Sequence, residues 1–169
     1  MCGIVGILSN NRNHIENIQE MLDTLLHRGP DGNQIYKDYS SPIALGHSRL
    51  SIIDLTSNGT QPKSSSTGRF VITFNGEIYN HQSLRKKIEN DLNDKLSWQG
   101  SSDTETLLMC FEHFGVSKTI ELITGMFAIA VWDKQLKEVT LIRDRFGEKP
   151  LYYSKFGQGQ DSVFVFASE

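Results

Sequence analysis

The chain has 169 residues, a size typical of one domain and long enough to bury a sizeable core. Apolar residues make up 38% and charged residues 22%, which is an ordinary globular balance. The net charge of −3 excludes a strongly basic nucleic-acid binder and gives no support for an anionic-membrane patch. Apolar runs such as Phe127–Trp132 are far shorter than the roughly 20 residues that span a bilayer. We therefore expect a soluble protein.

The cysteines and the N-terminus indicate the compartment. Cys2 and Cys110 are too few for a disulfide framework, and no charged segment followed by an apolar stretch opens the chain. The five histidines show no pairing typical of a zinc site. We expect a cytoplasmic protein with free thiols and no metal.

The predicted elements begin with a strand and a helix. A nearly continuous apolar run predicts a buried strand over Cys2–Leu8. Asn13, followed by Glu16, is a helix-start signature, and Gly29-Pro30 is a helix stop. Apolar side chains keep helical spacing between these signals, at Ile15, Ile18, Leu22, Leu25 and Leu26. Strands are then predicted over Gln34–Asp38, Ile43–Ile53 and Arg69–Phe74, with a Ser-, Thr- and Gly-rich loop over Asn58–Gly68.

Helices and then strands fill the second half of the chain. Asn80 is the expected cap of a helix that buries Leu84, Ile88 and Leu92. Ser102 and Glu105 form a predicted capping box for a helix that Gly115 ends, and a short helix follows near Ile120–Ile123. Four strands are predicted over Met126–Asp133, Glu138–Asp144, Leu151–Ser154 and Val163–Ala167. Because helices and strands come in blocks, we predict an α+β fold with mostly antiparallel sheets.

Cys2 is the first residue that could take part in catalysis. Removal of Met1 would leave a thiol and a free α-amine on one residue, and an amine with a pKa of roughly 7.7–8.0 can serve as the base for its own nucleophile. The alternative is that Cys2 is a small apolar residue at the start of a buried strand. Cys110 lies within an apolar helical pattern, where core packing is the better interpretation.

Asn75-Gly76 comes after the predicted strand Arg69–Phe74. Asn-Gly is a strong signal for a hairpin turn, but the following residues lead toward a helix and not toward a returning strand. A side-chain amide beside a glycine N–H could instead supply two donors to an oxyanion. Both interpretations stay open on local grounds.

Arg49 and Asp103 have plausible structural and functional interpretations. An arginine in a largely buried strand needs a partner, which is either an internal acid or a substrate carboxylate that fits its planar fork. The side chain could also extend to solvent. Asp103 lies in the first turn of a helix, where the dipole favours a carboxylate, and an acid there could also hold a substrate ammonium.

Seven motifs in one order decide between these alternatives. They are MCGIVGI at Met1–Ile7, HRGPDG at His27–Gly32, GHSRLSIID at Gly46–Asp54, NGEIYN at Asn75–Asn80, SDTE at Ser102–Glu105, GMFA at Gly125–Ala128 and RDRFGEKPLYY at Arg143–Tyr153. Together they resemble class II glutamine amidotransferases, the glutaminase domains of the N-terminal-nucleophile hydrolases, over essentially the whole chain. The variants are most similar to glutamine-dependent asparagine synthetases.

The resemblance implies a fold and a role for each matched residue. The fold would be a four-layer αββα sandwich with two antiparallel sheets. Cys2 would be the nucleophile, with the Asn75 side chain and the Gly76 N–H as oxyanion donors. Substrate glutamine would be bound through its α-carboxylate by Arg49, through its α-amine by Glu77 and Asp103, and along the backbone of Leu50, Ser51, Ile52 and Ile53.

The resemblance also implies what lies outside the chain. We expect residues 1–169 to form a glutaminase domain truncated at its C-terminal end, with a separate synthetase domain of the parent chain as its partner and glutamine as its substrate. No Ser-Gly-Gly-x-Asp-Ser-like loop is present, so we expect no cofactor here, with ATP and magnesium confined to the synthetase domain. Alternatives are a non-catalytic glutamine- or partner-binding module and a stand-alone amide hydrolase.

Overall fold

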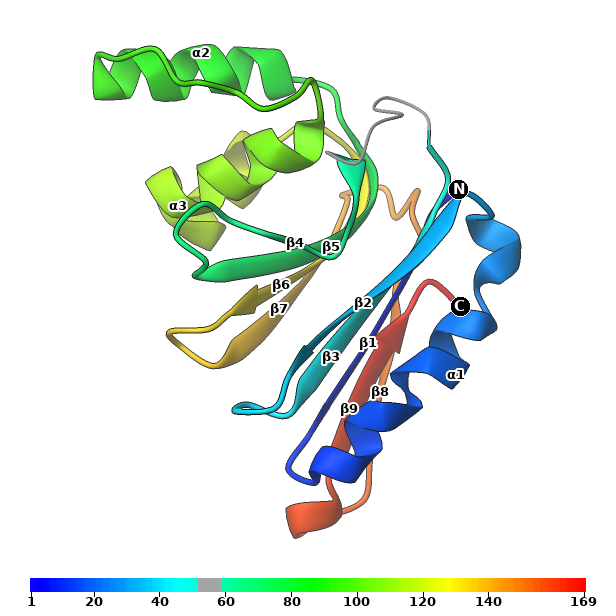
Figure 1. The fold of residues 1–169 in the computed structure, drawn as a ribbon. Coiled ribbons are helices and arrows are strands. Elements are labelled where there is room, and N and C mark those ends of the chain that lie inside the picture. The colour runs from blue at the N-terminus through cyan, green and yellow to red at the C-terminus, as the bar shows by residue number, and fades with distance from the viewer. Residues whose placement is uncertain (52–58) are drawn as a thin grey trace.

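The computed structural model describes residues 1–51 and 59–169, and it is built around two antiparallel sheets that lie face to face (Figure 1). One sheet has five strands in the order β2-β3-β1-β9-β8, and the other has four in the order β4-β5-β6-β7. The predicted α+β class with antiparallel sheets is therefore confirmed.

The five-stranded sheet joins the two ends of the chain. Its strands are β1 (Gly3–Ser9), β2 (Gly32–Asp38), β3 (Ile43–Arg49), β8 (Tyr152–Phe156) and β9 (Val163–Ala167). β1 is central and pairs with β3 from Gly3↔Ser48 to Leu8↔Ile43. This register brings the start of the chain beside the end of β3.

The four-stranded sheet contains β4 (Lys63–Ser64), β5 (Phe70–Ile78), β6 (Gly125–Asp133) and β7 (Glu138–Arg143). β5 and β6 pair continuously from Phe70↔Asp133 to Ile78↔Gly125. β4 pairs only with Ile72 and Val71, and no other strand of the described residues lies on this edge of β5.

Helices cover the outer face of each sheet, which gives the four layers αββα (Figure 1). On the five-stranded sheet the 3₁₀ helix η1 (Arg12–Asn17), α1 (Ile18–Asp23) and the 3₁₀ turn η2 (Leu26–Arg28) cover one face, with Leu22 and Leu25 buried. α2 (His81–Leu92) and α3 (Asp103–Leu122) cover the other sheet. Between the sheets lies a third cluster that includes Trp132 and Phe166. A further 3₁₀ turn, η4 (Gly159–Asp161), precedes β9.

The N-terminal helical segment differs from the single helix expected. The cap is Asn11, whose side chain accepts a hydrogen bond from the Asn13 N–H, and not Asn13 itself. The segment bends twice through 3₁₀ turns, and Leu26 is exposed while Ile15, Ile18, Leu22 and Leu25 are buried as predicted. Packing against the twisted sheet thus overrides the regular helical repeat.

The caps of α2 and α3 also differ in part from the prediction. Asn80 is at the cap position of α2, but its side chain bridges the Leu122 carbonyl and the Thr124 N–H. Ser102 does cap α3, through the Thr104 N–H, whereas the Glu105 carboxylate accepts from Gln99 and Gly100 and completes no capping box. At the exposed end of α2, Leu92 is not buried.

Gly115 marks a break inside α3, at φ +77° and ψ 168°, so the helical turns on either side of it are distinct as predicted. Cys110 is buried in the core between α3 and the sheet, and its burial raises the pKa of its thiol to about 12. No helix in the described part of the chain is long and apolar enough to cross a membrane.

The most consequential difference concerns β5. The strand does not end at Phe74: it continues through Asn75-Gly76 to Ile78, so neither the predicted strand end nor the hairpin-turn interpretation is correct. Pairing with β6 keeps these residues extended, although Asn-Gly favours a turn locally. Likewise, β3 ends at Arg49, short of the predicted Ile53; Ile52 and Ile53 lie outside the described residues.

Candidate active site

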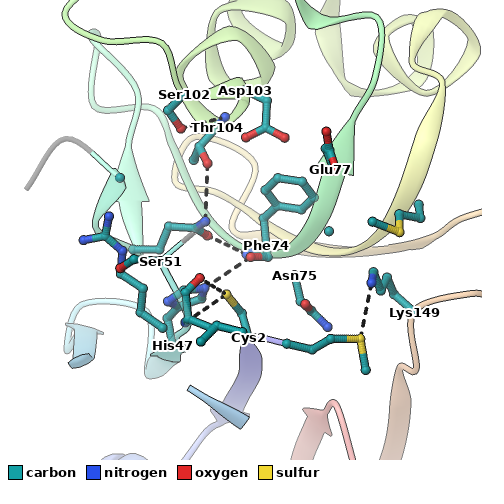
Figure 2. Close-up of a pocket in the computed structure, with 17 residues that line it drawn as sticks. Cys2, His47, Ser51, Phe74, Asn75, Glu77, Ser102, Asp103, Thr104 and Lys149 are labelled. Atoms are coloured by element: carbon teal, nitrogen blue, oxygen red, sulfur yellow. Dashed lines mark hydrogen bonds between the residues drawn. The ribbon is translucent and has the colours of Figure 1, made fainter. Parts of the chain in front are cut away.

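A pocket opens where β1 begins and where β3 and β5 approach their ends. It is lined by Cys2, Arg49, Leu50, Ser51, Asn75, Gly76, Glu77 and Asp103, which are the described members of the predicted site. Residues from four segments that are far apart in sequence therefore converge on one place. Figure 2 shows Asp103 and Glu77 on the side of the pocket away from Cys2.

The Cys2 thiol lies against the backbone of Leu50. The Leu50 N–H donates to Cys2 Sγ at 3.3 Å, and Sγ lies 3.5 Å from the Leu50 carbonyl oxygen (Figure 2). Arg28 Nε also donates to the Cys2 carbonyl at 3.3 Å. These contacts hold both ends of the residue.

Strand alternation directs Asn75 toward Cys2. Val71 and Thr73 share its face of β5; Val71 packs between the sheets and Thr73 Oγ1 donates to the Gly46 carbonyl of β3. Asn75 is only 2% exposed. Within the described residues, its Nδ2 has no hydrogen-bond partner. A buried amide donor without a partner is costly, and such groups often have a catalytic role.

Gly76 is required by the close packing of β5 on β6. A Cβ on Gly76 would lie 2.1 Å from the Met126 carbonyl oxygen and 2.7 Å from the Phe127 Cα, and its φ is +156°. Gly76 lies two residues after Phe74 on β5, so the N–H groups of both residues point to the same edge of the strand. This edge faces away from β6 and borders the pocket.

Asp103 begins α3 and is only 4% exposed. One of its carboxylate oxygens, Oδ2, accepts a hydrogen bond from the Ile78 N–H at 2.9 Å. Burial raises the pKa of this carboxyl above its ordinary value, while the Ile78 N–H and the nearby His81 act in the opposite direction. A substrate ammonium beside it would also favour the carboxylate.

Arg49 lies at the end of β3, half-buried on the pocket wall. Beside it, the Ser51 N–H donates to Asp31 Oδ2 at 2.7 Å, which fixes the backbone after β3 against the HRGPDG segment. The geometry is compatible with Arg49 binding a carboxylate inside the pocket, and this role stays a prediction.

Other pocket residues were given no role by the sequence. His47, Gln61, Phe74, Met126 and Lys149 all line it. His47 could have been found, because strand alternation puts it on the same face as Arg49. Gln61 gave no signal, since it lies in a polar stretch that reads as an ordinary loop. Lys149 Nζ, although largely buried, donates to the Met1 thioether sulfur at 3.3 Å.

The comparisons with known proteins identify the family of the chain. The family model described as a glutamine amidotransferase domain matches residues 1–169. The chain belongs to this family. Asparagine synthetase [glutamine-hydrolyzing] 2 of Bacillus subtilis is 36% identical over 174 aligned residues, which cover 100% of this chain and 22% of the relative. Amidase chry2 of Gibberella zeae is 35% identical, over 83% of this chain and 20% of its own length.

A solved structure supports the fold assignment. Glutamine phosphoribosylpyrophosphate amidotransferase from Bacillus subtilis superposes with a TM-score of 0.75, covering 99% of this chain and 42% of the other, at 20% identity. The class II glutamine amidotransferase domain thus has the predicted fold of N-terminal-nucleophile hydrolases. The chain spans only 20% to 34% of the length of the curated relatives it matches.

Proposed function

We propose that this domain hydrolyses the side-chain amide of glutamine to glutamate and ammonia, with Cys2 as the nucleophile. The observation that carries the proposal is the buried Asn75 Nδ2, which has no partner among the described residues and lines the same pocket as the Cys2 thiol. Family membership supports the reaction class.

In the proposed first step, the α-amine of Cys2, freed by removal of Met1, takes the thiol proton. The sulfur then forms a bond to the amide carbon of glutamine, and the carbonyl oxygen becomes an oxyanion. The Asn75 amide and the Gly76 N–H would stabilise that charge, which develops only along the reaction. As the C–N bond breaks, the protonated amine returns its proton to the leaving nitrogen, and ammonia departs.

The second step releases the product. The remaining γ-glutamyl thioester is attacked by water, with the same amine as base, so that glutamate leaves and the Cys2 thiol is restored. Arg49 would bind the α-carboxylate, whereas Asp103 and Glu77 would bind the α-ammonium. The position of the two acids away from Cys2 in Figure 2 supports this orientation.

Curated relatives suggest the fate of the ammonia. Several are asparagine synthetases that use glutamine, and each is at least about three times as long as this chain. We therefore propose that a synthetase domain is the partner of this domain and uses its ammonia in an ATP- and magnesium-dependent amidation in the cytoplasm. A second candidate, an amidase acting on another amide, is favoured by the amidase-named relative at 35% identity.

The test compares three samples: the chain with Met1 removed, the chain with Met1 retained by inhibition of methionine aminopeptidase, and the processed Cys2→Ala variant. Intact mass establishes the state of each N-terminus. We expect glutamate release without ATP only from the first sample, and labelling of Cys2 but not of buried Cys110 by a glutamine-like diazoketone. Cys110→Ala is the matched control and should keep its turnover.

The outcomes separate the alternatives. Normal turnover by Cys2→Ala would contradict the nucleophile assignment. Glutamine binding without turnover by the processed chain would favour a non-catalytic module. Simple amides hydrolysed as well as glutamine would favour the amidase alternative, because the contacts to the α-amino and α-carboxylate groups would then contribute nothing.

A further inference from the structure

On the edge of β5 that faces away from β6, side chains make hydrogen bonds to the strand backbone. Where β4 is present, its residues and the neighbouring Ser65 bond this edge: the Ser65 N–H donates to the Phe70 carbonyl, and Ser65 Oγ accepts from the Phe70 N–H. β4 begins only at Lys63, opposite Ile72. From Phe74 onward, no strand within residues 1–51 and 59–169 lies beside this edge, yet it is the part of β5 that borders the pocket.

Phe74 is held at this edge by two buried side chains. Gln61 Oε1 accepts a hydrogen bond from the Phe74 N–H at 2.6 Å, and His47 Nε2 lies 3.2 Å from the Phe74 carbonyl oxygen (Figure 2). Gln61 is itself fixed, because its Nε2 donates to Thr104 Oγ1 at 3.3 Å at the start of α3. The backbone N–H and the carbonyl of Phe74 are therefore both hydrogen-bonded by side chains and not by a neighbouring strand of its own sheet.

The state of the His47 ring follows from its partner. A carbonyl oxygen only accepts, so Nε2 must carry the proton of this hydrogen bond. Burial lowers the pKa of His47 to about 4, which keeps the ring neutral near pH 7 with a single proton. Nδ1 is then unprotonated, and within the described residues it has no hydrogen-bond partner. The ring therefore acts as a neutral donor that spans from β3 to β5.

We propose that Gln61 and His47 are positioning residues of the oxyanion hole, which act by fixing the Phe74 peptide groups and through them Asn75 and Gly76. The proposal rests on the proposed glutaminase function. Asn75 Nδ2 has no hydrogen-bond partner among the described residues to orient it, so its direction depends on the backbone that carries it. The Phe74 carbonyl belongs to the peptide that supplies the Asn75 nitrogen, so the contact with His47 lies directly beside the donor. An error of about 1 Å in such a group can reduce a rate about 100-fold.

The experiment uses the processed chain and compares variants at the edge of β5. Gln61→Met removes the acceptor while keeping the side-chain length, and His47→Phe removes the ring donor. His47→Gln is the conservative variant, since a Gln amide can place an N–H near the position of Nε2. Ser65→Ala is the matched control because it deletes a side-chain bond to the same edge of the same strand, at Phe70 and away from the pocket.

We expect Gln61→Met and His47→Phe to lower kcat for glutamine about 10-fold or more with KM changed less than about threefold. His47→Gln should restore kcat to within about threefold of the parent, and Ser65→Ala should leave kcat unchanged. Amide hydrogen exchange by NMR supplies a readout independent of activity. The Phe74 amide should exchange faster in Gln61→Met, whereas the Asn75 amide should keep its protection because the two residues direct their amides to opposite edges.

Each result has a stated consequence. If folded Gln61→Met and His47→Phe keep kcat within twofold of an active parent, the positioning role is wrong while the proposed function stands. If KM rises and kcat does not change, these residues serve ground-state binding and the proposal is equally wrong. An inactive, processed parent would overturn the proposed function, and this inference with it.

Discussion

The Asp103 carboxylate accepts a hydrogen bond from the Ile78 backbone N–H at 2.9 Å, so the acid predicted to bind the substrate amine also holds the end of β5. Asp103 begins α3, and Ile78 is the last residue of the strand that carries Asn75. One carboxylate thus connects the predicted binding group for the α-amine with the strand of the predicted oxyanion donors.

Two substitutions can separate the predicted binding role of Asp103 from its structural contact with Ile78. Asp103→Asn keeps an oxygen that can accept from Ile78 but removes the charge, so it should fold normally and discriminate less between glutamine and analogues without an α-amine. Asp103→Ala loses both, and we expect it also to unfold more readily, by about 1–3 kcal/mol for the unpaired N–H. Steady-state kinetics with both substrates and chemical denaturation measure the two effects. Unchanged discrimination in Asp103→Asn would leave Asp103 with a structural role only.

Asn75 should contribute to turnover and little to stability or binding. Loss of one oxyanion donor costs roughly 10²–10³ in rate, about 3–4 kcal/mol. We expect this loss in both Asn75→Ala and Asn75→Gly, with thermal stability and glutamine binding little changed. Asn75→Asp should be at least as damaging, because it would place an anion beside the developing oxyanion. Turnover of Asn75→Gly within a few-fold of the parent would exclude the donor role.

Arg49 should affect KM more than kcat. Each charge-assisted hydrogen bond to a substrate carboxylate is worth roughly 1.5–3 kcal/mol, so Arg49→Ala should raise KM for glutamine at least about 10-fold. Arg12 is exposed and outside the pocket, which makes Arg12→Ala the control for the loss of one positive charge. Equal glutamine affinity in the parent and Arg49→Ala would remove Arg49 from the binding site.

Gly76→Ala should destabilise the chain and abolish turnover. The added Cβ would lie 2.1 Å from a backbone oxygen of β6, so β5 must separate from its partner strand or shift. We expect a loss of about 1–3 kcal/mol in the free energy of unfolding. Gly32→Ala is the control, because nothing lies within 4 Å of its added Cβ; its stability should change by less than about 0.5 kcal/mol. A fully active, stable Gly76→Ala would show that close packing here is not needed.

His47 should make stability depend on pH in a defined window. Burial, with a smaller opposing contribution from the Phe74 carbonyl and a lowering one from Arg49, brings its pKa from 6.5 to about 4. Between these values the unfolded chain binds a proton at His47 that the folded chain does not. The contribution of neutral His47 to the free energy of unfolding is therefore fully present above about pH 6.5 and is lost as the pH falls toward 4. The full difference corresponds to about 3 kcal/mol.

Urea denaturation from pH 4 to 8 measures this effect. Carboxylates titrate in the same range, so the informative quantity is the difference in the free energy of unfolding between the parent and His47→Gln. This difference should become smaller as the pH falls below about 6.5. Parallel pH profiles for the two proteins would mean that folding does not lower the pKa of His47.

The sequence by itself determined the family and predicted eight of the described residues that line the pocket. Cys2-Gly3 at the start and the ordered motifs through Arg143–Tyr153 depend only on residue type and spacing. Apolar periodicity predicted most of the helices and strands and a fold with mostly antiparallel sheets, whereas the sandwich of two sheets was implied by the family resemblance. These signals are local, because they come from residues within a few turns or strand positions of each other.

Only the tertiary structure decided how the site is held together. The Asn-Gly pair favours a turn, yet pairing with β6 keeps Asn75 and Gly76 extended, and this made the local prediction wrong. Gln61 reaches Phe74 from an unremarkable loop, and Leu50 meets Cys2 across 48 positions of sequence. Such contacts leave no pattern along the chain, because a polar side chain looks the same in sequence whether it faces solvent or completes the hydrogen bonds of a buried strand edge.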